Sequence, residues 1–196
     1  MCIRDRCTIG KELGVSRTPV REAVRQLALE GLVQVIPNKG AFVTGISVRD
    51  VMDMYQIRAR LEGLCASMAA EHVTKEQLEG MEEAIVLSDY HAGKGNYDQV
   101  CQQDSRFHKL LYEASGSRIL VHTLGDFHQY LQRVRMASVQ YRMRVRPSNS
   151  EHRKILEAIR QGDGQAAEKA AYGHIANTIE NLKNFDLEKV LREEMK

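Results

Sequence analysis

A helical hydrophobic pattern fills most of the chain after Thr44, and it constrains the fold more than any other feature. Apolar residues recur there at spacings of three and four, which places them on one helix face and turns that face toward a core. Short breaks rich in glycine, serine and asparagine separate the segments, and no strand pattern competes. The predicted helices are 48–71, 75–92, 97–115, 117–142, 149–161 and 163–185. We therefore predict an all-α bundle of six helices over residues 48–186, followed by a charged tail at 187–196.

Residues 1–45 have a different pattern and are predicted to form a separate domain. Two short helices are expected within 8–32, with a turn around Gly14 between them. Either Ser16 or Thr18 can cap the second helix, because both offer a hydroxyl just before or at its start. Gly31 is expected to end it.

Two short β-type runs follow the helix pair, at 32–36 and 41–44. The residues between them, Pro37-Asn38-Lys39-Gly40, have strong turn chemistry, so the two runs are predicted to form a β-hairpin. A helix pair followed by a hairpin is the order of elements in a winged helix-turn-helix. The predicted fold class is therefore mainly α, with a partial winged helix-turn-helix preceding the helical bundle.

The start of the second short helix has the chemistry of a DNA-reading element. Arg17 and Arg21 lie four residues apart and share a helix face, where guanidinium groups can bind guanine or phosphate. Hydroxyl groups and a helix N-terminus suit phosphate oxygens, and a glycine at the hairpin tip permits close approach to a groove. The alternative is a solvated basic surface. The candidate DNA-binding residues are Ser16, Arg17, Thr18, Arg21, Lys39 and Gly40.

Composition narrows the class of protein only modestly. The formal net charge is +2, so charge alone names no partner. The four cysteines form no C-x-x-C pair and match no zinc-finger spacing. No apolar run approaches the length of a membrane span, and no signal peptide opens the chain, so we expect no membrane partner and a cytoplasmic protein.

Three histidines and one aspartate fall on inward faces of predicted helices. Asp104 and His108 share a face of one helix, while His152 and His174 continue apolar stripes on two others. Buried polar groups need partners, and this donor set suits a borderline divalent metal. The alternative is a set of hydrogen-bonded core residues. Three imidazoles favour zinc, with nickel or manganese as further candidates.

The run from Leu13 to Ala23, with Glu30-Gly31-Leu32 and the hairpin, resembles the winged helix of the GntR superfamily of bacterial regulators. The segment Asp104–Leu111, then Glu151-His152 and Tyr172–Ile175, resembles the metal-ligand motifs of the FCD ligand domain in its FadR subfamily. This resemblance implies metal ligands Asp104, His108, His152 and His174. It also implies a homodimeric repressor or activator on a palindromic operator, controlled by a small organic acid.

One departure from that family pattern concerns the N-terminus. Members have a full helix before the first one predicted here, and residues 1–7 are too short for it. These residues are interpreted as a truncation or an assembly scar, which would weaken DNA binding by the chain as it stands.

An effector carboxylate held at the metal would need a cation partner. Arg58 lies on the apolar stripe of the first long helix and Arg135 on that of the fourth, so both are candidate effector-binding residues. The alternative for each is an internal pair with a glutamate. Rival functions are a metal-dependent hydrolase, a bundle without a ligand and a fatty acyl-CoA sensor; no H-E-x-x-H helix supports the first.

Overall fold

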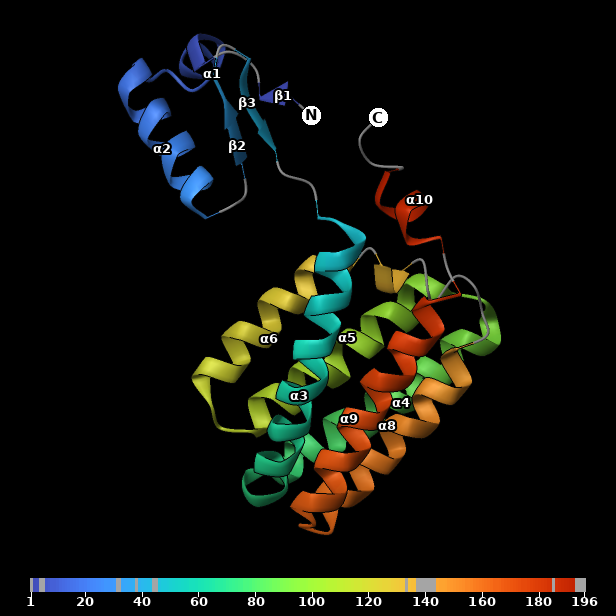
Figure 1. The fold of residues 1–196 in the computed structure, drawn as a ribbon. Coiled ribbons are helices and arrows are strands. Elements are labelled where there is room, and N and C mark those ends of the chain that lie inside the picture. The colour runs from blue at the N-terminus through green and yellow to red at the C-terminus, as the bar shows by residue number, and fades with distance from the viewer. Residues whose placement is uncertain are drawn as a thin grey trace. The chain divides into compact units, whose positions relative to one another are not determined.

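The computed structural model describes residues 2–3, 6–30, 33–37, 39–43, 46–132, 134–136, 144–184 and 186–192. The chain divides into two compact units (Figure 1). One holds the residues up to Ser47, and the other begins at Val48 and contains all the longer helices. Each unit is described by itself.

The N-terminal unit combines two helices with a small antiparallel sheet. The helices are α1 (Arg6–Glu12) and α2 (Arg17–Leu29), and the strands are β1 (Cys2–Ile3), β2 (Val33–Ile36) and β3 (Gly40–Val43). Strands β2 and β3 form the predicted hairpin, with Val33 opposite Val43. The strand order is β1-β3-β2, so the sequence analysis missed β1, a strand of two residues that is too short for a pattern.

A small apolar core holds this unit together. Val20 and Val24 lie one turn apart on α2 and pack with Val33 and Ala41 of the sheet. Ser16 occupies the N-cap position of α2, in extended conformation, while Thr18 lies inside the helix, so Ser16 is the better of the two predicted caps. The predicted helix end at Gly31 and the strand residues Leu32 and Thr44 lie outside the described residues.

The C-terminal unit is all-helical, which confirms the predicted fold class. Its helices are α3 (Val48–His72), α4 (Lys75–Lys94), α5 (Tyr97–Ala114), α6 (Arg118–Tyr130), α8 (Val145–Arg160), α9 (Gly164–Leu182) and α10 (Leu187–Arg192). Thr74 and Gln77 form a capping box at the start of α4, and Gly95 ends that helix in the left-handed region at φ 75°.

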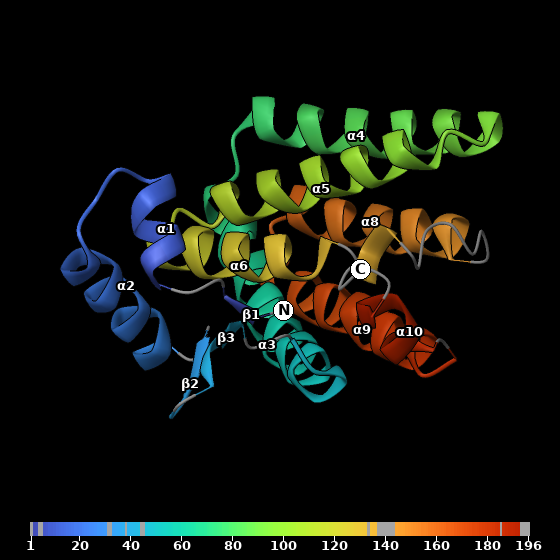
Figure 2. The same ribbon diagram turned by 90° about the horizontal axis from the view of Figure 1, so that it is seen from above.

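The helices of this unit pack side by side around one core (Figure 2). Helix α3 packs on α9, α5 lies between α4 and α6, and α8 contacts both α4 and α9. The largest apolar side chains of the core, among them Met81, Phe107 and Leu111, are almost fully buried. The segment predicted as a charged tail begins with helix α10, which contacts α3 and whose Leu187 is buried. No helix among the described residues is long and apolar enough to cross a membrane.

Two predicted helix boundaries are wrong. The helix expected over 117–142 is interrupted, because α6 ends at Tyr130 and a turn at Leu131 precedes a further helical piece at 134–136; residues 137–143 lie outside the described residues. Helix α8 begins at Val145, four residues before the predicted start. Pro147 caused that error, since proline usually marks a boundary, but it is tolerated in the first turn of a helix, where no intrahelical N–H bond is required.

Candidate metal centre

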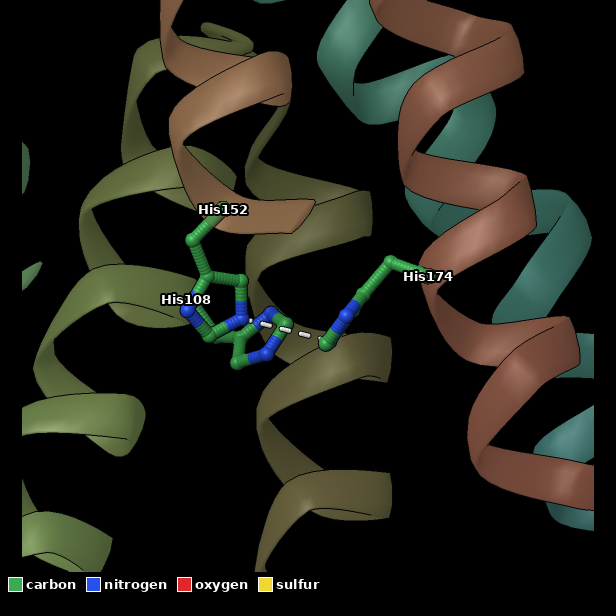
Figure 3. A group of neighbouring side chains, drawn as sticks. All are labelled: His108, His152 and His174. Atoms are coloured by element: carbon green, nitrogen blue, oxygen red, sulfur yellow. Dashed lines mark hydrogen bonds between the residues drawn. The ribbon is translucent and has the colours of Figure 1, made fainter. Parts of the chain in front are cut away.

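Three buried imidazoles converge in the C-terminal unit from three different helices (Figure 3). His108 comes from α5, His152 from α8 and His174 from α9, and each side chain is at most 4% exposed. Nε2 of His152 lies 3.2 Å from Nε2 of His174, and one nitrogen from each ring lies within 4.8 Å of the others. The separation of the His152 and His174 nitrogens suits two ligands of one ion at metal–nitrogen distances of about 2.0–2.1 Å, and the His108 ring lies beside both.

Asp104 adds a carboxylate to this group from one turn earlier in α5. Its Oδ1 lies 3.7 Å from Nε2 of His152 and 3.9 Å from Nε2 of His108. Its Oδ2 accepts a hydrogen bond from Arg135. Burial by itself raises the pKa of Asp104, but Arg135 and the imidazoles outweigh it and hold that pKa well below its usual range. Asp104 therefore presents an ionised oxygen to the three rings.

Two further carboxylates lie behind the imidazoles, on the side away from the cluster. Oε2 of Glu151 lies 2.8 Å from Nδ1 of His174, and Oε2 of Glu62 lies 3.2 Å from Nδ1 of His108. When a carboxylate accepts a hydrogen bond from one ring nitrogen of a histidine, the other ring nitrogen is left to bind a metal. Carboxylate–histidine pairs of this kind accompany most metal-binding histidines. Sequence reasoning missed both roles, although Glu151 adjoins His152 and Glu62 follows Arg58 by one helical turn.

The protonation states of His108 and His152 also suit a metal. Burial lowers the pKa of His108 and, together with the neighbouring His174, lowers that of His152 well below its usual range. Neutral imidazole is the form that binds metal ions. Imidazole nitrogens together with a carboxylate oxygen match the donor types of zinc and other borderline metals. The residues present therefore fit a divalent ion of this class.

The two candidate effector arginines have different surroundings. The buried Arg58 donates from Nε to Oε1 of Glu62 at 2.6 Å, which is the internal pairing considered as its alternative role. Arg135 is 7% exposed and donates to Asp104 and, at 3.0 Å, to Oγ of Ser105; it also lies against His128. Both arginines line the same cavity as Asp104, His108 and His174.

That cavity has a volume of about 60 Å³ and is walled by residues of α3, α4, α5, α8 and α9, together with Arg135. A third arginine, Arg144, also lines it. Arg144 makes two hydrogen bonds to Glu151, at 2.9 and 2.6 Å. The sequence analysis missed Arg144, because the predicted start of its helix lay beyond it.

The candidate DNA-binding residues all lie in the N-terminal unit and are exposed. Ser16, Arg17, Thr18 and Arg21 occupy the N-cap and first turns of α2. Lys39 and Gly40 lie at the hairpin turn, where Gly40 has a φ of 104°. This conformation is easy only for glycine. The two arginines are thus available on one helix surface, as predicted from their spacing.

Comparisons with known proteins agree with this architecture. Residues 8–43 match the model of bacterial regulatory proteins of the gntR family, and residues 53–177 match the FCD domain. The uncharacterised HTH-type transcriptional regulator YdhC of Bacillus subtilis is 28% identical over 177 residues, which span 90% of this chain and 79% of YdhC. The HTH-type transcriptional repressor RspR of Escherichia coli is also 28% identical, over 90% of this chain and 78% of RspR.

Solved structures show the same fold. McbR/YncC of E. coli aligns with a TM-score of 0.65 and 21% identity, covering 91% of this chain and 85% of that one. The named relatives are regulators, which argues against the hydrolase considered from the sequence. With a GntR helix-turn-helix at its N-terminus and an FCD domain after it, this chain belongs to the GntR family of bacterial DNA-binding transcriptional regulators.

Proposed function

We propose that the helical unit of this regulator senses a small organic acid at a divalent metal held by His108, His152, His174 and Asp104. The observation that carries the proposal is the convergence of three buried imidazoles, two of them backed by carboxylates. A hydrogen-bonded core cluster would not require two glutamates oriented behind the rings. Zinc is the first candidate, and nickel or manganese are alternatives.

The effector carboxylate would occupy the cavity beside the four ligands. When bound, the metal supplies a Lewis-acidic position for one carboxylate oxygen. Arg135 supports this role, since its guanidinium lines the cavity and is the charged donor nearest to Asp104 in the described contacts. Arg58 instead donates a hydrogen bond to Glu62, which favours a role in holding that glutamate rather than the effector. A cavity of this size favours a small acid over a fatty acyl-CoA.

At the other end of the chain, α2 would enter the major groove of operator DNA. The exposed Arg17 and Arg21 would contact bases or phosphates, and Lys39 with Gly40 would approach a neighbouring groove. A homodimer would place two such helices on a palindromic operator. The effector can alter DNA binding only through different affinities for the two states of the regulator.

Metal analysis tests the sensor part of this proposal. Protein purified without chelators or metal-affinity resin is expected to carry about one divalent ion per chain by mass spectrometry, and His174→Ala to lose it. His122→Ala is the matched control, because the side chain of His122 is 79% exposed and pairs with Asp126 away from the cluster. Native protein that neither carries nor takes up a metal would identify the cluster as a hydrogen-bonded core.

A further inference from the structure

The hydroxyl of Tyr55 has no partner in the wall of the sensor cavity. Tyr55 lies in α3, is fully buried at 0% exposure and lines the cavity together with Asp104 and His108. Its oxygen makes no hydrogen bond to any residue that the structure describes. A buried hydroxyl in this condition costs on the order of 1–3 kcal/mol, so its presence calls for an explanation.

Two other hydroxyl groups of the same cavity, those of Ser88 and Thr178, are hydrogen-bonded within the protein. Ser88 accepts a hydrogen bond from Nδ2 of Asn149 at 3.0 Å. Thr178 donates to the carbonyl of His174 at 3.0 Å. Tyr55 differs from both, since its donor and its acceptor capacity are unused by the described residues.

The Tyr55 ring is also held in place. The guanidinium of Arg58 lies 5.8 Å from the ring centroid, and Arg58 is itself fixed by its pair with Glu62. A fixed ring keeps the hydroxyl directed at one place, which is how a site recognises a single oxygen of a ligand. Burial raises the pKa of Tyr55, so the hydroxyl keeps its proton at neutral pH and can donate as well as accept.

We propose that Tyr55 is a specificity-determining residue that hydrogen-bonds a hydroxyl group of the effector, and that the effector is therefore a small hydroxy acid. This rests on the proposed function, in which the effector carboxylate lies in this cavity. The carboxylate would have Arg135 and the metal as partners, and the unpaired Tyr55 oxygen would offer a hydroxyl beside it both a donor and an acceptor. Sites built to bond a hydroxyl discriminate strongly against the analogue that lacks it.

Two matched pairs of acids test this proposal: glycolate with acetate, and lactate with propionate. Each pair differs by one hydroxyl. Binding to the metal-loaded full chain is measured by isothermal titration for the native protein, for Tyr55→Phe and for the control Tyr90→Phe, whose side chain is exposed. Metal content and melting temperature are measured on the same samples. Both variants are expected to keep their metal and their melting temperature, since Tyr55→Phe removes only an unpaired hydroxyl.

The native protein and Tyr90→Phe are expected to bind the hydroxylated member of each pair roughly tenfold more tightly. In Tyr55→Phe that preference should become smaller, and any preference that remains would come from direct contact of the α-hydroxyl with the metal. The affinity for acetate and propionate should not change. The variant carries the same metal, so the difference between it and the native protein isolates the Tyr55 contact.

Three results would overturn the proposal. The native protein could bind both members equally, Tyr55→Phe could keep the full preference, or the variant could lose affinity equally for all four acids, which would place Tyr55 on the carboxylate. A native protein that takes up no metal would instead overturn the proposed function and this proposal with it, whereas a metal-loaded protein that binds none of the four acids would overturn this proposal alone.

Discussion

Glu151 links His174 and Arg144 at the candidate metal centre through a single carboxylate. One oxygen lies against Nδ1 of His174, and both receive hydrogen bonds from Arg144. Burial alone would raise the pKa of Glu151, but the bonds to His174 and Arg144 lower it to about 2. The carboxylate is therefore ionised whenever His174 is able to bind a metal, and it holds the ring so that Nε2 faces the other imidazoles.

We expect Glu151→Gln to weaken metal binding by roughly 10–100-fold, the usual effect of losing a carboxylate behind a ligand histidine. The amide keeps the shape but loses the charge that orients and polarises the ring. Competition with a fluorescent chelator measures the affinity. Glu157→Gln, an exposed position on the same helix, is the control. Equal affinities in the two variants would contradict the orienting role.

His128 should make the metal-free protein sensitive to mild acid. Burial and, next, Arg135 lower its pKa to about 2. Below about pH 6.5 the unfolded chain takes up a proton that the folded ring does not accept, so the free energy of unfolding falls as the pH falls. The contribution of this ring is at most about 1.4 kcal/mol per pH unit.

Urea unfolding in chelator at pH 7.5, 6.5 and 5.5 measures that dependence. His128→Gln is expected to have a shallower slope than native protein, with the remaining slope due to His108 and His152, whose pKa values are also lowered. The exposed His122→Gln should behave like native protein. Identical slopes for the native protein and His128→Gln would show that the ring is protonated in the folded state.

At the scale of elements, α2 is the helix proposed to read DNA, and its bounds are Arg17–Leu29. Val20 and Val24 fasten one face of the helix to the sheet, which leaves Arg17 and Arg21 on its exposed side. Ser16 at the N-cap leaves the first backbone N–H groups of the helix without a side-chain hydrogen bond. Such free N–H groups at a helix N-terminus suit phosphate oxygens.

Arg21→Ala is expected to cost roughly 1–3 kcal/mol of operator binding, the value of one good base contact. Gel shifts with the DNA upstream of the regulator's own gene measure it, at two salt concentrations. Arg49→Ala, a 91% exposed arginine in α3, serves as the control. If Arg21→Ala binds as tightly as the control, α2 does not read the operator through this side chain.

At the scale of the whole molecule, the candidate metal ligands and the candidate DNA-binding residues belong to different compact units. The proposed ligands come from α5, α8 and α9, so a bound metal would join three helices of the bundle. An ion that binds only the folded state stabilises that state. The effect should be confined to the helical unit.

Removal of the metal is therefore expected to lower the melting temperature of the helical unit. A free metal concentration 1,000-fold above the Kd would contribute about 4 kcal/mol, which chelation would remove. Circular dichroism melts with chelator, and with chelator followed by excess zinc, measure the loss and its recovery. DNA binding should persist without metal, whereas the response to hydroxy acids should not. A melting temperature unaffected by chelation would contradict a structural contribution of the metal.

Local signals in the sequence determined the elements of this protein. Helical periodicity, the turn at Gly14 and the Pro37–Gly40 turn need only neighbours along the chain, so the helix pair, the hairpin and the all-α bundle were predictable. The inward positions of His108, His152 and His174 followed from the same periodicity. Their role as metal ligands stays a prediction.

The tertiary structure alone decided which side chains serve those histidines. Glu62 lies 46 residues before His108, and Glu151 lies 23 before His174, so neither pair has a sequence spacing that identifies it. The end of α6 at Tyr130 and the start of α8 at Val145 set where Arg135 and Arg144 reach the cavity. In the sequence, Tyr55 cannot be told apart from any other aromatic residue on the apolar face of a helix. The packing of α3 against the other helices shows that its hydroxyl is buried without a hydrogen-bond partner among the described residues. The physical reason is that hydrogen bonding and burial depend on neighbours in space, which a periodic pattern along one helix does not specify.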